Sequence, residues 1–330
     1  MIRPTARFAS VIALAAISLP LSNAVAQQQV PAAPAPEVSA PAPSAAITLP
    51  KPNPADFTAV SPTKEMVSAF LQMAWGYDDS RVWQVQGILK TPAEGTSKVF
   101  IVVADKSGKV KPSMLHFYVL PDGKHILAGD ELLPFGDHPY TEFRALLQQR
   151  ADGPYRGSAA KDLELVEFAD FQCPHCKEAQ ANMDKLVADF PKARIVFQNY
   201  PLGNAAWKGS KPAASYGVCV AKLGGSDAFF QYASTVFDGQ DGLSSDDGVT
   251  LTLNAAVAKV GLDPAKVAAC AATPETKAAV EASVKLGKDV GVVETPTLLV
   301  NGRQVPLGGL PYETIKQIVQ YQMKLDGLTQ

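Results

Sequence analysis

Concentrated positive charge is missing from this sequence. The 330 residues include 30 lysines and arginines against 32 aspartates and glutamates, and no basic cluster occurs along the chain. Proteins that bind nucleic acid or other polyanions through charge need a basic patch on one face. The composition therefore disfavours a nucleic-acid partner.

An apolar run long enough to span a membrane is also missing near the N-terminus. The run at 8–21 is shorter than the roughly 20 apolar residues that a spanning helix needs. It follows Arg3 and Arg7 and precedes the small residues 24–26, which is the pattern of a cleavable signal peptide at 1–26. No cysteine stands directly after that cleavage site, which disfavours a lipoprotein anchor. We therefore expect export and a periplasmic location rather than an uncleaved helix buried in a fold.

Residues 27–54 contain almost no large apolar side chain and are rich in proline and alanine. This composition cannot bury enough surface to offset chain entropy, so it predicts an extended linker. About 275 residues remain, which suffices for two domains of the usual size of roughly 100–200 residues each.

Cysteine and clusters of acid–base residues are absent from residues 55–138. A helical pattern begins near Ser61 and Pro62, and strand-like segments separated by turn sequences follow it. This order predicts a helix packed on a small antiparallel sheet, which is an α+β domain. The lone histidines His116 and His125 lie in or beside strands and are interpreted as surface or core residues. The predicted strands are 82–89, 99–104, 115–120 and 126–128.

A linker helix is expected within 139–154, and residues 155–330 then alternate between strand and helix patterns. This alternation predicts an α/β fold in which helices cover a mixed sheet. The predicted elements are a strand at 163–171, a helix at 173–189, a strand at 194–199, a helical stretch at about 205–289, a strand at 297–300, a turn at 301–302 and a helix at 311–325.

Two of the four cysteines, Cys173 and Cys176, enclose the dipeptide Pro174-His175. Positions i and i+3 share a helix face, so the two sulfurs can come within bonding distance. Cys173 is expected at the helix N-terminus, where free amide hydrogens and the helix dipole favour a thiolate. Pro174 suits the first turn, and His175 can add a hydrogen bond or a charge, whereas Asp170 acts against the thiolate. Because a stabilised thiolate is a good leaving group, we expect a readily reduced disulfide.

Other uses of these cysteines are less consistent with the sequence. Covalent haem attachment requires histidine directly after the second cysteine, where Lys177 stands. Zinc would need two more ligands, and Cys219 and Cys270 lack the spacing of a ligand pair. We therefore expect no metal and no cofactor.

Residues 164–176, ELVEFADFQCPHC, resemble the active-site strand and helix of the DsbA family of thioredoxin-fold thiol–disulfide oxidoreductases, including the Pro-His dipeptide. Residues 295–297, followed by a strand and the 301–302 turn, resemble the cis-proline loop of that family. The helical stretch matches the family's helical insertion in position and length. The resemblance covers about 155–328 and implies a thioredoxin-like fold with a helical insertion.

The same resemblance implies roles for individual residues. Cys173 corresponds to the nucleophile and Cys176 to the buried resolving thiol. Glu167 matches a buried acid that assists proton transfer to and from Cys176, although a surface acid at a strand edge is the alternative. A cis bond before Pro296 would leave the backbone of Thr295 free to pair with a substrate peptide, whereas a trans proline opening an edge strand is the alternative.

The remaining cysteines, Cys219 and Cys270, are expected to form a structural disulfide. Four cysteines allow three pairings, and assigning Cys173 and Cys176 to catalysis leaves only this one. Two free thiols in an oxidising compartment are the less favoured alternative.

The N-terminal α+β part is similar in architecture to the cystatin-like dimerisation module of the DsbC and DsbG isomerases. Thr295 before Pro296 also resembles the residue at this position in those isomerases. The expected function is a dithiol oxidase that donates its disulfide to exported proteins with cysteines and is re-oxidised by a membrane redox partner. A dimeric isomerase or reductase, assembled through the N-terminal domain, is the enzymatic alternative. A periplasmic chaperone or assembly factor is the alternative from another class.

Overall fold

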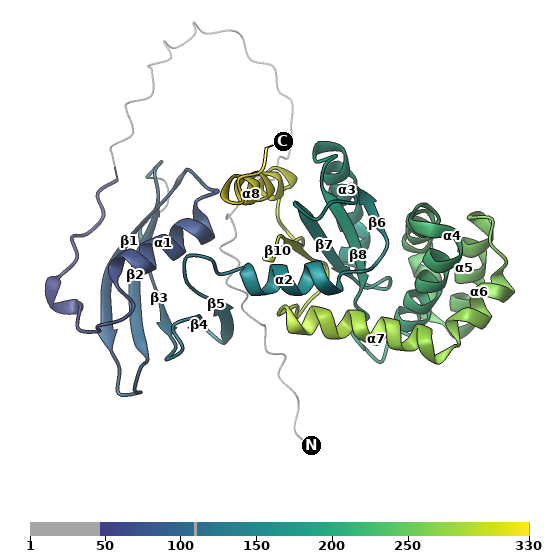
Figure 1. Ribbon diagram of the computed structural model, residues 1–330, viewed down its shortest axis with the longest axis horizontal. Helices are drawn as coiled ribbons and strands as arrows, with labels where there is room; N and C mark the ends of the chain where they lie inside the picture. The colour runs from purple at the N-terminus through teal and green to yellow at the C-terminus, as the bar shows by residue number, and fades with distance from the viewer. Residues whose placement is uncertain (1–46, 109–110, 330) are drawn as a thin grey trace, which may run out of the picture. The chain divides into compact units, whose positions relative to one another are not determined.

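The computed structural model describes residues 47–108 and 111–329 (Figure 1). The signal peptide predicted at 1–26 lies outside the described residues, as does most of the linker predicted at 27–54. The chain divides into two compact units, Met1–Asp137 and His138–Gln330, which are described separately.

The first unit combines helix α1 with an antiparallel sheet whose strands follow chain order, β1-β2-β3-β4-β5. A short 3-10 turn, η1, precedes the helix. The elements are η1 Pro54–Asp56, α1 Lys64–Trp75, β1 Arg81–Lys90, β2 Ser97–Asp105, β3 Ser113–Val119, β4 His125–Ala128 and β5 Glu131–Pro134.

Capping and burial explain why α1 forms and where it packs. The helix begins where the Thr63 hydroxyl accepts a hydrogen bond from the Met66 N–H at 3.2 Å. Phe70 lies on its buried side, with its ring centroid 6.2 Å from that of Phe117 on β3. Alternate residues of the sheet, such as Ile101, complete this core. The predicted α+β class of this part is confirmed.

The expectation of four strands in this sheet is wrong, because β5 is a fifth. Leu133 of β5 pairs with Ile126 of β4, while Leu132 is exposed. The strand is short and ends in Pro134, so the sequence carries no alternation long enough to identify it. Pairing with β4 makes it a strand.

The second unit contains a mixed sheet in the order β10-β9-β7-β8-β6, in which β7 and β8 are parallel and the other pairs are antiparallel. Strand β6 was not predicted from the sequence. The elements are α2 Thr141–Arg150, β6 Tyr155–Gly157, β7 Glu164–Ala169, α3 Pro174–Asp189, β8 Arg194–Asn199, β9 Thr297–Val300, β10 Arg303–Pro306 and α8 Tyr312–Leu325.

Helices cover both faces of this sheet. Leu147 of α2 and Leu286 of α7 belong to one buried cluster with Val166 and Phe168 of β7. Glu167 alternates with these residues along β7, so its side chain lies on the opposite face, where α3 packs. The strand is buried along its whole length, and its C-terminal end leads into the short turn that precedes α3.

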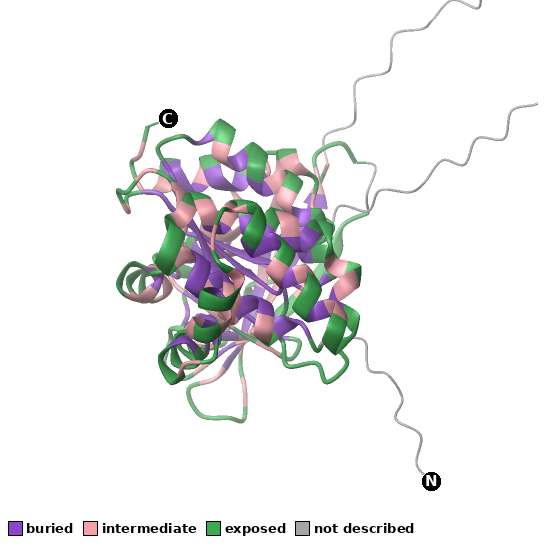
Figure 2. Ribbon diagram, turned by 90° about the vertical axis from the view of Figure 1, so that its right-hand side faces the viewer, coloured by how far each residue is buried: buried purple, intermediate pink, exposed green. Residues whose placement is uncertain are grey.

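A helical insertion separates β8 from β9, and its core continues into the turn between β7 and α3. Figure 2 shows buried residues on the inward sides of its helices, and Phe171, Phe229 and Tyr232 belong to that core. The thioredoxin-like fold with a helical insertion, expected from the sequence, is confirmed. The insertion consists of α4 Ser210–Asp238, η2 Gln240–Ser244, α5 Asp246–Lys259, α6 Pro264–Ala271 and α7 Pro274–Asp289.

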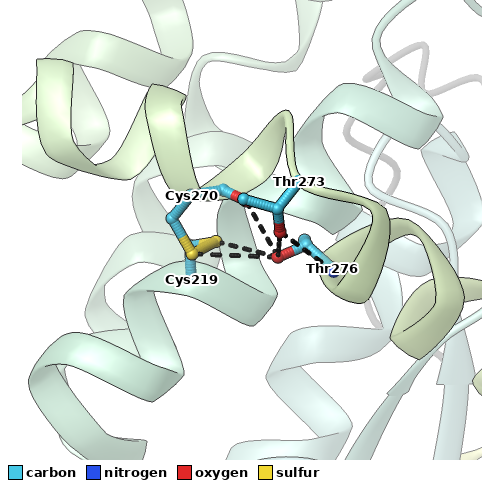
Figure 3. The surroundings of a disulfide bond; sticks show 4 residues. All are labelled: Cys219, Cys270, Thr273 and Thr276. Carbon is cyan, nitrogen blue, oxygen red and sulfur yellow. Dashed lines mark hydrogen bonds between the residues drawn. A yellow bond between two sulfur atoms is a disulfide. The ribbon is translucent and has the colours of Figure 1, made fainter.

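A disulfide between Cys219 and Cys270 joins α4 to α6 within the insertion (Figure 3). The Thr276 hydroxyl at the start of α7 donates a hydrogen bond to the Cys270 carbonyl at 2.9 Å and lies 3.4 Å from the Cys219 sulfur. Three helices of the insertion are therefore tied together at one buried point.

Candidate active site

The CPHC motif lies at the junction between β7 and α3. Cys173 is the N-cap residue of α3, with extended backbone angles, and Pro174 is its first helical residue. Proline is tolerated there because its missing N–H has no helical acceptor. The Cys173 N–H donates to the Asp170 carbonyl at 3.1 Å, which closes the turn between strand and helix.

Cys173 is a free cysteine, and its thiol is more acidic than an ordinary cysteine thiol. Hydrogen bonding from the Cys176 thiol is the largest effect that lowers its pKa, and the N–H groups of Cys176 and His175 act in the same direction. These effects outweigh burial and bring the pKa of Cys173 to about 6, from an ordinary value of 9.0. Near neutral pH the Cys173 sulfur is therefore a thiolate.

Cys176 has the opposite character although it belongs to the same turn. It is fully buried, and burial followed by the hydrogen bond to Cys173 raises the pKa of its thiol well above the ordinary range. The Asp170 N–H points at its sulfur at 3.4 Å. The site thus pairs a thiolate with a protonated thiol.

Glu167 is buried beneath this pair. Its carboxylate accepts a hydrogen bond from the Gln180 side chain at 2.8 Å, and the same Gln180 amide donates to the Cys176 carbonyl at 3.1 Å. Burial is the main effect that raises the pKa of Glu167 to about 7. A carboxyl group with that pKa exchanges its proton readily near neutral pH. The sequence alternative of a surface acid does not fit this burial.

The loop before β9 closes the other side of the site. The Thr295–Pro296 bond is cis, and Thr295 is buried. The Cys173 thiol, when protonated, donates to the Thr295 carbonyl at 3.4 Å. The structure therefore brings Cys173, Cys176, Thr295 and Pro296 together.

His175 occupies a different position from the one expected for its ring. The ring is exposed, and its Nδ1 lies 3.1 Å from Glu178 Oε2 rather than on the Cys173 sulfur. The hydrogen bond with Glu178 is the main effect that raises the pKa of His175, and the Cys173 charge contributes further. His175 therefore acts on the thiolate through its backbone N–H and its charge.

Comparison with known proteins agrees with this fold. A family model described as thioredoxin matches residues 149–321, which is more than half of the chain. The chain belongs to the thioredoxin family.

Several solved structures are also similar to part of this chain. A thioredoxin-like oxidoreductase from Silicibacter pomeroyi is 26% identical, with a TM-score of 0.47 over 55% of this chain and 98% of that one. The thiol–disulfide exchange protein alpha-DsbA2 from Wolbachia pipientis is 21% identical, with a TM-score of 0.46 over 55% and 96%. BdbD from Bacillus subtilis is 22% identical, with a TM-score of 0.46 over 52% and 93%.

Two curated proteins also match, both named as Na(+)/H(+) antiporters. The NhaA protein of Herminiimonas arsenicoxydans is 29% identical over 46% of this chain, and NhaA 3 of Salinispora tropica is 36% identical over 14%. The chain spans only 22% and 7% of their lengths, respectively. Within residues 47–108 and 111–329, no helix is long and apolar enough to cross a membrane.

Two features of this thioredoxin site were not predicted from the sequence. Gln240 in η2 donates hydrogen bonds to the carbonyls of Phe171 and Cys173, at 2.8 and 3.0 Å, and so ties the helical insertion to the active-site turn. Gln180 bridges Glu167 and α3. Neither glutamine lies in a motif, so only the tertiary structure identifies it. In the described part of the chain, no cluster of histidine, cysteine, aspartate or glutamate would hold a metal ion.

Proposed function

We propose that this protein is a thiol–disulfide oxidoreductase that works as a dithiol oxidase on exported proteins. The observation that carries the proposal is the asymmetry of the CPHC pair, in which the pKa of Cys173 is about 6 while that of Cys176 is raised. A disulfide that releases a stabilised thiolate is reduced more readily by substrate thiols than one that releases an ordinary thiolate. Membership of the thioredoxin family supports the same chemistry.

The reaction would begin when a substrate thiolate attacks the Cys173 sulfur of the Cys173–Cys176 disulfide. The bond between the two cysteines breaks, Cys176 leaves and takes up a proton, and a mixed disulfide forms between Cys173 and the substrate. A second substrate thiolate then attacks the substrate sulfur and releases Cys173 as a thiolate. Two electrons pass from the substrate dithiol to the protein, one proton remains on Cys176, and the other goes to solvent.

Glu167 would supply and receive the proton of Cys176. Its pKa of about 7 suits proton transfer near neutral pH, and Gln180 holds it against the helical turn that contains Cys176. Thr295 and Pro296 would present backbone groups to the substrate peptide. Return to the disulfide requires removal of two electrons from the Cys173–Cys176 pair. We propose that a membrane redox partner removes them at the periplasmic side.

The test compares reduced and scrambled substrates. The oxidised protein should oxidise a reduced model protein, Cys173→Ser should abolish this activity, and Cys176→Ser should accumulate the mixed disulfide. A reduction potential close to that of thioredoxin, about −270 mV, would instead favour a reductase or isomerase. If the double Cys173→Ser and Cys176→Ser protein kept full activity in a refolding assay, a chaperone or assembly factor would replace the proposal.

A further inference from the structure

A large groove lies in the second unit between helices α4, α6 and α7. Its volume is about 1020 Å³. Buried Ala271 and Val280 and the half-buried Tyr216 contribute to its apolar lining. The lining also includes the segment 200–203 after β8 and Val293, which is 80% exposed.

Two short connections join these lining residues to the cysteines. The Leu202 N–H donates to the Asp170 carboxylate at 2.9 Å, and the Asp170 N–H points at the Cys176 sulfur at 3.4 Å. Val293 stands two residues before Thr295, whose carbonyl accepts from the Cys173 thiol. The groove lining therefore includes chain segments that adjoin those holding the two cysteines.

The rim of the groove carries a positive charge that contrasts with the chain's formal net charge of −2. Its lysines are Lys211, Lys277, Lys285 and Lys288, against the single acid Glu281. Lys285 is paired with Asp289 at 2.7 Å, outside the groove lining. Among the described residues, the other three lysines make no ion pair and are exposed. Their stems can cover apolar surface while their ammonium groups remain free for an incoming carboxylate.

We propose that this groove binds the segment of client polypeptide next to the reacting cysteine and selects segments that combine acidic and apolar side chains. The inference rests on the proposed function and names its substrate class. The charged groups are flexible lysines at the rim, an arrangement that suits carboxylates at varying positions along a polypeptide. A site for one small ligand would instead place a few polar groups in fixed orientation inside the cavity.

The disulfide supports a preformed groove. It joins Cys219 on α4 to Cys270 on α6, and Thr276 on α7 bonds to the Cys270 carbonyl, so the three walls are held together (Figure 3). A groove whose walls are fixed before binding loses less conformational entropy when a peptide enters.

The test measures binding without disulfide exchange. A fluorescent peptide of apolar and acidic residues without cysteine, and a counterpart with lysine at each acidic position, are titrated with the full mature protein at low salt. The acidic peptide should bind at least about tenfold more tightly, and added salt should reduce the difference. The triple variant Lys211→Glu, Lys277→Glu and Lys288→Glu should lose this preference.

A second triple variant controls for net charge. Lys222→Glu, Lys259→Glu and Lys266→Glu change exposed lysines outside the groove lining and should keep the preference. Equal binding of both peptides, or an unchanged preference in the groove variant, would overturn the inference. Tighter binding of laurate, with displacement of the acidic peptide, would assign the groove to a free amphiphile and overturn it as well.

The same samples separate this inference from the proposed function. Exchange of the Cys173–Cys176 disulfide with dithiothreitol, a small uncharged dithiol, should be unchanged in both lysine variants. Normal exchange without peptide preference would defeat only the inference. Absence of exchange in the unmodified protein would defeat the proposed function, whereas the cysteine-free binding result would still stand.

Discussion

At the scale of single residues, the chemistry depends on two thiols whose proton affinities diverge within one helical turn. The sequence predicts the position of Cys173 at a helix N-terminus and hence the direction of its pKa. It does not predict that the Cys176 thiol is the strongest stabiliser of the thiolate, or that the His175 ring turns to Glu178. Both depend on side-chain orientations that only the packed site determines.

Alkylation of the reduced protein should distinguish the two thiols. We expect Cys173 to be half-maximally reactive near pH 6, because hydrogen bonds hold its thiolate, and Cys176 to remain unreactive up to pH 9. Rates are measured with iodoacetamide and the labelled cysteine is identified by peptide mapping, with Cys173→Ser as the control. Half-maximal reactivity of Cys173 at about pH 8.5–9, the range of an ordinary thiol, would contradict an activated nucleophile.

Glu167 should make the protein less stable as the pH rises. Its pKa is raised from 4.5 to about 7, so between these values the folded protein holds a proton that the unfolded chain releases. The free energy of unfolding therefore falls across this window, by about 3 kcal/mol for this group. Glu167→Gln should remove this part of the pH dependence in urea titrations from pH 4.5 to 8, whereas Glu94→Gln on the surface should keep it. If the free energy of unfolding varied with pH in the same way in all three proteins, the raised pKa of Glu167 would be contradicted.

At the scale of elements, the sequence predicts those that carry their own pattern. The run at 163–171 and the amphipathic segment after Cys173 correspond to β7 and α3. Strand β6 has three residues and exists because Tyr155 and its neighbours pair with β8, so no local signal marks it. Short edge strands of this kind depend on their partners rather than on propensity.

Removing the disulfide of the insertion should destabilise the second unit. Cys219 and Cys270 are 51 positions apart, and their crosslink restricts the unfolded chain by about 4 kcal/mol at most. Replacing both with alanine should lower the free energy of unfolding by an amount approaching this value, measured by denaturant titration of the oxidised proteins. Peptide mapping without reduction provides the control. Two free thiols there in exported protein would show that the bond does not form in the cell.

At the scale of the whole molecule, the site combines segments that are distant in the chain. The motif at β7 and α3, the cis-proline loop and η2 all contact the same turn. The resemblance to the DsbA family predicts the first two, since each carries a recognisable motif. The contribution of Gln240 depends on how the helical insertion folds back onto the turn, which its local sequence does not reveal.

The first unit should mediate assembly. It has its own core but no catalytic residues, and Met114 and Leu132 expose 62% and 60% of their surface. A unit with its own core but no catalytic residues suits a symmetric dimer. Light scattering on mature protein and on residues 138–330 alone should give a dimer and a monomer, respectively. Monomers in both cases would leave docking to another protein as the role of this unit.

The low pKa of Cys173 and the expected dimer favour opposite directions of disulfide exchange. The low pKa of Cys173 favours donation of the disulfide, because reduction releases a stable thiolate, whereas a dimeric assembly favours the holding of clients during isomerisation. We expect the thiolate to dominate, because its stability enters the exchange equilibrium directly and assembly does not. The oxidised protein should therefore restore a reduced multi-disulfide substrate faster than the reduced protein rescues the same substrate in scrambled form. Both assays use equal active-site concentrations, with Cys173→Ser as the blank. Faster rescue of the scrambled form would make isomerisation the principal activity.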